Sequence, residues 1–234
     1  MKQGQGFSLV EIAIVLVILG FLIGSLLRPL AKKVEHDKIK LTQHSLEEIK
    51  QALLGYAVLH GCLPCPVLAA NKAEGKENRG VNIDVCSQPC SNPIKEGFLP
   101  WLDLGVGKYD AWGNMFRYRV KEEYTDYRLA PQLTSSLNIV NYEGSNLTVS
   151  GDSRVAAIIF SYGQNGQPDN ANQPEDQLYI QDGYLENQFD DILTWLSKNT
   201  VNDYLITAGK KNYALATANN EWTNKIMTSY YLTP

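Results

Sequence analysis

Residues 6–27 read GFSLVEIAIVLVILGFLIGSLL, an apolar run with one ionisable side chain, Glu11. At a helical rise of about 1.5 Å per residue, residues 7–27 reach the ~30 Å thickness of a bilayer core. The rest of the chain is polar, rich in Asn, Tyr and Gln, and too sparsely apolar for a second span. The sequence therefore predicts one N-terminal membrane anchor followed by one water-facing domain.

A helical pattern continues beyond this run. Between residues 31 and 60, apolar residues recur at three- and four-residue spacing: Ile39, Leu46, Ile49, Leu53 and Tyr56. A single helix is predicted from residue 7 to about residue 59, kinked at Pro29 because proline lacks the N–H and crowds the preceding turn. A cleaved signal peptide is the alternative, but the run exceeds the usual ~7–15 apolar residues and no small-x-small cleavage site follows.

Composition and motifs exclude several functions. The chain has 21 basic and 25 acidic residues without a basic block, which argues against nucleic-acid binding. No nucleophile elbow, P-loop or Rossmann glycine pattern is present. We therefore expect a protein that is not an enzyme.

The segments after residue 100 predict strands and one more helix. Trp112 and Gly113 predict a tight turn leading into a half-buried strand over 116–120, and 155–162 predict a second strand ended by Gly163. Residues 129–149 predict further strands or a variable insertion. Helical spacing over 189–208 predicts a helix with Gly209 as its C-cap. The expected fold class is α+β, a long helix packed against a small antiparallel sheet.

The four cysteines form a C-x2-C pair and a C-x3-C pair: Cys62, Cys65, Cys86 and Cys90. In a reducing compartment this spacing suits a zinc site, whereas in an oxidising one an even number of cysteines favours disulfides. A thiol oxidoreductase is less favoured, because redox C-x-x-C motifs open a helix and this one follows a helix and contains proline. Four cysteines allow three pairings, and the sequence alone does not choose among them.

The segment Gly6-Phe7-Ser8-Leu9-Val10-Glu11, after a short leader, resembles the processing motif of type IV pilins and type II secretion pseudopilins. The resemblance implies cleavage after Gly6 by a prepilin peptidase and N-methylation of Phe7. It also implies that Glu11 meets the amino terminus of a neighbouring subunit during assembly. Independently, a carboxylate in an apolar span costs a few kcal/mol and favours a cationic partner, as a free α-amino group is.

Later motifs extend the resemblance to pseudopilin-like minor pilins and the type IV pilin fold; they lie at 97–101, 104–105, 110–113, 118–120, 161–166 and 190–195. The implied organisation is a leader at 1–6, a transmembrane half-helix at 7–27, an amphipathic half-helix at 28–60 and a globular head at 61–234. The segment Leu63-Pro64-Cys65-Pro66 also resembles relatives in which a later cysteine is the partner, which favours pairing Cys65 with Cys86 and Cys62 with Cys90.

Oxygen-bearing side chains in residues 164–176 are of the kind that calcium uses, with Asp169 and Asp176 as candidate ligands. Major pseudopilins bind calcium in the comparable loop, after a Ser-x-Gly-x-Asp-Gly turn. Here Asn165 stands where that aspartate is expected, so a solvated turn without a metal is the alternative. No other cofactor is expected.

The function implied by the resemblance is that of a structural subunit of a type IV pilus or type II secretion-type filament. Such a subunit is stored in the bacterial inner membrane with a periplasmic head. Its partners are other subunits, bound through the N-terminal helix, the prepilin peptidase and the inner-membrane assembly machinery. The alternatives are a membrane-anchored periplasmic binding module and a tethered zinc or thiol-redox protein.

Overall fold

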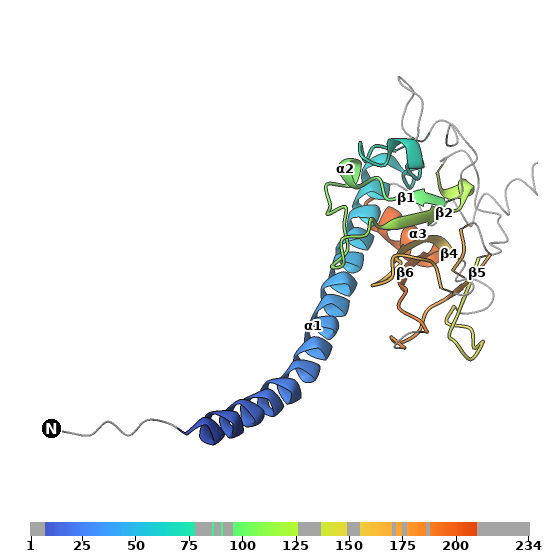
Figure 1. Ribbon diagram of the computed structural model, residues 1–234. Helices are drawn as coiled ribbons and strands as arrows, with labels where there is room; N and C mark the ends of the chain where they lie inside the picture. Colours follow the sequence, from blue (N-terminus) through green and yellow to red (C-terminus); the bar gives the residue numbers. More distant parts are fainter. Residues whose placement is uncertain are drawn as a thin grey trace, which may run out of the picture. The chain divides into compact units, whose positions relative to one another are not determined.

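The computed structural model describes residues 8–77, 86, 90, 96–125, 137–148, 155–169, 172–174, 177–185 and 188–209, with the backbone alone at 25–28 and 123. The chain divides into two compact units, residues 1–41 and 42–234. Along the chain, the elements are α1 (Leu9–His60), η1 (Ala69–Asn71), β1 (Glu96–Phe98), α2 (Trp101–Leu104), β2 (Arg117–Val120), η2 (Glu122–Tyr124), β3 (Asn138–Val140), β4 (Val155–Ser161), β5 (Leu178–Ile180), β6 (Ile192–Ser197) and α3 (Lys198–Thr207) (Figure 1). The predicted α+β layout is confirmed.

Helix α1 runs for 52 residues and passes through Pro29 without ending there. Its bounds agree with the predicted helix to within two residues. Over residues 9–24 its apolar side chains are exposed, for example Leu9 at 86% and Phe21 at 78%. The helix is long and apolar enough to cross a membrane. It ends at His60, after which Gly61 adopts the left-handed conformation (φ +85°).

The last turns of α1 belong to the second unit, the head, and bury one face. Leu46, Ile49, Leu53 and Ala57, spaced by three or four residues, are at most 2% exposed. This spacing places their side chains in one stripe. The change from an exposed apolar surface to a buried apolar stripe separates the anchor from the part of the helix that builds the head.

The head contains a four-stranded antiparallel sheet in the order β1-β2-β4-β6. Its central strand β4 is buried at all seven positions, as a strand covered on both faces must be. A second, two-stranded sheet pairs β3 with β5 in parallel. The predicted strands at 116–120 and 155–162 are confirmed; of the 129–149 segment, residues 137–148 contribute β3, and the remainder lies outside the described residues.

The turn before β2 is held by a buried carboxylate. Asp110 accepts hydrogen bonds from the backbone N–H of Trp112 (2.9 Å) and Asn114 (2.8 Å). The hydroxyl of Ser161 donates to the other Asp110 oxygen at 2.6 Å, which ties the turn to the end of β4. Gly113 has φ +94°, a conformation that favours glycine. The predicted tight turn is therefore confirmed.

The helix predicted over 189–208 is wrong in its first half, where the chain forms strand β6. Ile192, Leu193, Trp195 and Leu196 make a short apolar run rich in β-formers, and periodicity cannot distinguish such a run from a buried helix. Pairing with β4 decides the outcome. Helix α3 then begins where the hydroxyl of Ser197 accepts the Thr200 N–H at 3.0 Å. Gly209 follows α3 with φ +70°, the glycine conformation expected after a helix end.

Candidate functional site

The processing residues Gly6 and Phe7 lie outside the described residues, but Glu11 is described. It occupies the first turn of α1, and its N–H donates to the Ser8 carbonyl at 3.0 Å. A carboxylate is favoured there by the partial positive charge of a helix N-terminus. Exposed apolar side chains surround it, including Leu9, Val10 and Ile12. Glu11 is thus a single acidic group on an otherwise apolar, exposed helix surface, where a partner's cation can reach it.

The four cysteines form two disulfides, Cys62–Cys86 and Cys65–Cys90, each with 5.7 Å between Cα atoms. The expected pairing of Cys65 with Cys86 and Cys62 with Cys90 is wrong. Cys62 and Cys86 pack with Tyr56 in one buried cluster at the end of α1, which brings Cys86 to Cys62 and leaves Cys65 for Cys90.

This pairing leaves no free thiol among the four cysteines. A tetrathiolate zinc site requires deprotonated cysteines, and the nucleophile of a thiol oxidoreductase is a thiolate. The two disulfides therefore favour a disulfide-stabilised head over the zinc and thiol-redox interpretations.

The carboxylate of Glu77 fastens the disulfide region to α1. It accepts hydrogen bonds from the Tyr56 hydroxyl at 2.6 Å and from the Cys65 N–H at 2.9 Å. Asp103 of α2 in turn accepts the Glu77 N–H at 2.6 Å, and burial raises the pKa of Asp103 above its usual value. These contacts join α1, the segment that contains Cys65 and Glu77, and α2 in one part of the head.

Three aspartates converge beside the start of β6. The nearest carboxylate oxygens of Asp169, Asp190 and Asp191 all lie within 4.8 Å of one another. Backbone donors fix their positions: the Asp190 N–H donates to Asp169 at 2.7 Å, the Asp169 N–H to Asp191 at 2.9 Å, and the Asn165 N–H to Asp190 at 2.8 Å. The loop after β4 and the segment before β6 are therefore joined through their acidic side chains.

Two of these carboxylates are buried and incompletely hydrogen-bonded. Asp190 is 9% and Asp191 3% exposed, and one oxygen of each has no hydrogen-bond partner in the part of the chain that the structure describes. Burial, with the charge of Asp169 nearby, raises the pKa of Asp190 to about 6 and that of Asp191 to about 7. Oxygen donors of this type suit a hard cation such as calcium.

The sequence prediction identified only part of this acidic cluster. Asp169 belongs to it, whereas Asp176 lies outside the described residues. Asp190 and Asp191 were not predicted as ligands. Their signal is the pair of adjacent acidic residues directly before the apolar segment of β6, a position where the fold buries them.

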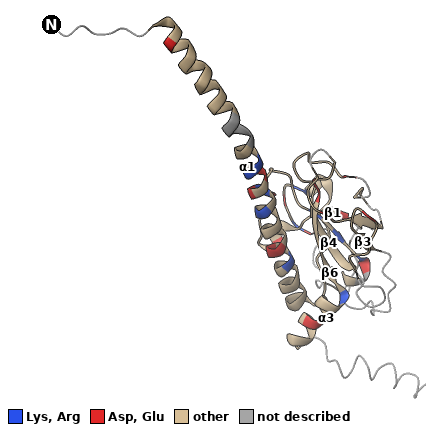
Figure 2. Cartoon of the chain, turned by 90° about the horizontal axis from the view of Figure 1, so that it is seen from below, with Lys and Arg blue, Asp and Glu red and all other residues tan. Residues whose placement is uncertain are grey.

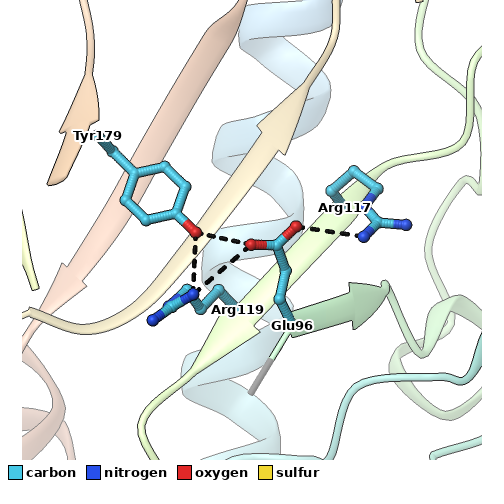
Figure 3. Close-up of polar contacts among 4 residues, drawn as sticks. All are labelled: Glu96, Arg117, Arg119 and Tyr179. Atoms are coloured by element: carbon cyan, nitrogen blue, oxygen red, sulfur yellow. Dashed lines mark hydrogen bonds and ion pairs between the residues drawn. The ribbon is translucent and has the colours of Figure 1, made fainter. Parts of the chain in front are cut away.

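A second polar network lies within the head and was also missed (Figure 3). Glu96 of β1 is paired in register with Arg119 of β2, and its side chain is fully buried. Its carboxylate accepts hydrogen bonds from the Tyr179 hydroxyl at 2.6 Å and from Arg117 at 3.2 Å, and lies 3.8 Å from the Arg119 guanidinium. Arg119 also donates to the Tyr179 oxygen at 3.2 Å.

Burial and the adjacent Glu96 charge raise the pKa of Tyr179 far above its ordinary value, so this phenol remains protonated and donates to Glu96. Because Tyr179 comes from β5, the network joins the four-stranded sheet to the two-stranded one. Its sequence signal is the pair Arg117 and Arg119, two residues apart on one strand and therefore on one face of the sheet.

Comparison with known proteins identifies the N-terminal segment. Residues 1–27 match the prokaryotic N-terminal methylation motif. No curated protein and no solved structure matches the chain. The motif supports a type IV pilin-like or pseudopilin-like subunit, anchored in a membrane before it assembles with other subunits. At residues 1–27, the chain carries the signature of type IV pilins and type II secretion pseudopilins.

Proposed function

We propose that this chain is a structural subunit of a type IV pilus or a type II secretion-type filament. A prepilin peptidase cleaves it after Gly6 and Phe7 is N-methylated. The observation that carries the proposal is the methylation motif at residues 1–27, which includes the first turns of a 52-residue helix whose apolar side chains are exposed there. The inner membrane holds this helix before assembly, with the head in the periplasm.

Extraction from the membrane replaces lipid contacts of α1 with contacts to the same helix in neighbouring subunits. Small residues permit close approach of helices, and a Cβ atom at Gly20 or Gly24 would meet nothing within 4 Å in the isolated chain. The carboxylate of Glu11 pairs with the α-amino group of Phe7 in a neighbour, which neutralises both charges inside the apolar filament core. The pair also sets the register of one subunit against the next.

A charge-removing variant of Glu11 tests this function. Glu11→Ala is expected to insert into the membrane, to be cleaved after Gly6 and to form both disulfides, yet to be depleted in filaments sheared from cells. Asp203→Ala, at an exposed carboxylate on α3 in the head, is the control and is expected to assemble normally. Normal incorporation of Glu11→Ala would contradict the proposed pairing, and failure of leader cleavage in the native chain would contradict the proposed function itself.

The acidic cluster supports a second proposal, that the head binds calcium through Asp169, Asp190 and Asp191. Two buried oxygens of the cluster lack hydrogen-bond partners among the described residues, which supports it, because a buried polar atom costs free energy unless a ligand satisfies it. A bound cation would offset the repulsion among three carboxylates and hold the loop after β4 against β6.

Thermal unfolding of the full chain in detergent, with calcium or with a chelator, tests this proposal. Calcium at about a hundred times its Kd is expected to stabilise the head by about 2.7 kcal/mol. Asp191→Asn is expected to abolish the increase in Tm, whereas Asp203→Asn, an exposed residue of α3, retains it. Equal Tm values with calcium and with chelator in the native chain would contradict calcium binding.

A further inference from the structure

A groove of about 570 Å³ opens on the head beside α1. One wall is the α1 surface of His44, Glu47, Glu48 and Gln51, and the other is the loop of residues 105–107 after α2. That loop contributes no charge, and a Cβ atom added at Gly105 or Gly107 would meet nothing within 4 Å. The groove is therefore acidic on one side and sterically open on the other.

In the part of the chain that the structure describes, the acidic side chains have only weak partners. Glu47 lies 3.5 Å from Lys50 and accepts a hydrogen bond from Gln51, and Glu48 lies 3.5 Å from His44. All these partners lie one turn away on the same helix, and the side chains of Glu47 and Glu48 are 55% and 64% exposed. Exposed pairs of this kind contribute little to stability, so a cation from a partner can compete with them.

The same helix carries a segment of opposite charge. Residues 28–40 hold five basic residues, Arg28, Lys32, Lys33, Lys38 and Lys40, against Glu35 and Asp37. Figure 2 shows the charged residues of α1 from Lys32 onward, beyond the stretch that bears only one acidic residue. Lys40 is exposed, so its ammonium group is open to a partner. Two parallel copies of α1, displaced along their axes, can bring the basic segment of one to the acidic surface of the other.

The displacement follows from the proposed pairing at the N-terminus. Phe7 and Glu11 are four residues apart, so each subunit is displaced by about 6 Å along the helix from the one it pairs with. Two such steps amount to eight residues, about 12 Å, which is the separation of Lys40 from Glu48. The register that satisfies Glu11 therefore also brings Lys40 of a second copy level with the groove.

We propose that the groove receives the basic segment of α1, residues 33–40, from a second copy of this chain, with Lys40 paired to Glu47 and Glu48. This inference rests on the proposed filament function and names the surface that a neighbouring subunit occupies. Opposite charges at this contact favour the staggered parallel arrangement and disfavour unstaggered neighbours, whose like-charged segments would face each other.

Charge reversal and charge exchange in the full chain test the contact. Glu47→Lys with Glu48→Lys, and separately Lys38→Glu with Lys40→Glu, are each expected to lower the sheared filament fraction about tenfold, because attraction becomes repulsion at every subunit contact. The chain carrying all four changes restores complementarity and is expected to return to within about twofold of the native amount. Assembly unchanged by either reversal, or not restored by the exchange, would overturn the proposal.

Two further measurements locate the contact. In the first, filaments assembled from a mixture of isotopically light and heavy chains are treated with a carbodiimide, which joins lysine to carboxylate side chains. Crosslinks that contain one light and one heavy peptide come from two different subunits, and they are expected between Lys38 or Lys40 and Glu47 or Glu48. Gly107→Leu, at a position without positive φ, fills the groove without backbone strain and is expected to reduce these crosslinks. Mixed crosslinks that join the groove to other lysines, or to another protein, would overturn the assignment.

These results separate the inference from the proposed function. Leader cleavage, N-methylation and both disulfides are measured in every variant by intact mass. A native chain that is never cleaved or assembled would contradict the filament function. Normal cleavage and assembly of the Glu47→Lys, Glu48→Lys chain would contradict the groove contact alone.

Discussion

Replacing Glu96 by glutamine should lower the unfolding free energy of the head by about 3–5 kcal/mol, because the buried Arg119 and the partly buried Arg117 lose their shared carboxylate. Arg119 is 4% exposed and the side chain of Arg117 16%, so water replaces little of the missing charge. Glutamine keeps the shape and one acceptor oxygen but not the charge. The Tyr179 hydroxyl can still donate to it, so most of the loss comes from the two arginines.

Urea unfolding of the oxidised full chain in detergent, followed by near-ultraviolet circular dichroism, measures this loss. With a slope of about 2 kcal/mol per molar urea, the midpoint should fall by about 2 M. Glu48→Gln, whose side chain is 64% exposed, is the control and should cost less than about 0.5 kcal/mol. Adding Arg119→Met to Glu96→Gln should recover part of the loss, because one unpaired buried charge is removed. A loss below about 1 kcal/mol for Glu96→Gln would refute this reasoning.

Three further perturbations are predicted for the head. In chelator, the unfolding free energy of the head should fall by on the order of 4 kcal/mol between pH 4 and 8. The native Asp191 carboxyl, with its pKa near 7, retains a proton that the unfolded chain releases near pH 3.8, so raising the pH favours the unfolded chain. A Tm that does not change across this range would contradict this pH dependence. Ser197→Ala should cost about 1 kcal/mol in urea unfolding, because the Thr200 N–H loses its capping acceptor, and an unchanged midpoint would count against the cap. Replacing both Cys65 and Cys90 by serine should cost up to about 3.5 kcal/mol, the chain-entropy value for a 25-residue separation, and an unaltered Tm would argue against that bridge.

The elements whose signals are local and periodic were predicted well from the sequence. The apolar run and the heptad-like spacing of Leu46, Ile49 and Leu53 predicted both ends of α1 to within two residues. The turn at Asp110 leads into a strand, as the sequence predicted. In both cases neighbouring residues contain the whole signal. The methylation motif is likewise contiguous, so the amino-acid sequence by itself is sufficient to identify it.

Features that depend on pairing between distant segments were predicted less well. The disulfide partners depend on how Cys86 packs against Tyr56, and β6 was mistaken for helix because only its pairing with β4 distinguishes a short apolar strand. Asp191 and Glu96 were missed for the same reason. Their burial beside Asp169 and Arg119, respectively, follows from the sheet register and is not visible in a single segment.

The most direct test of the central claim is the intact mass of the non-reduced protein purified from its native membrane, together with sequencing of its N-terminal peptide. We predict a chain that starts at N-methylated Phe7 and is lighter by four hydrogens than the reduced form, two for each disulfide. A chain that starts at Met1 and carries four free or metal-bound thiols would contradict both the prepilin processing and the oxidised head.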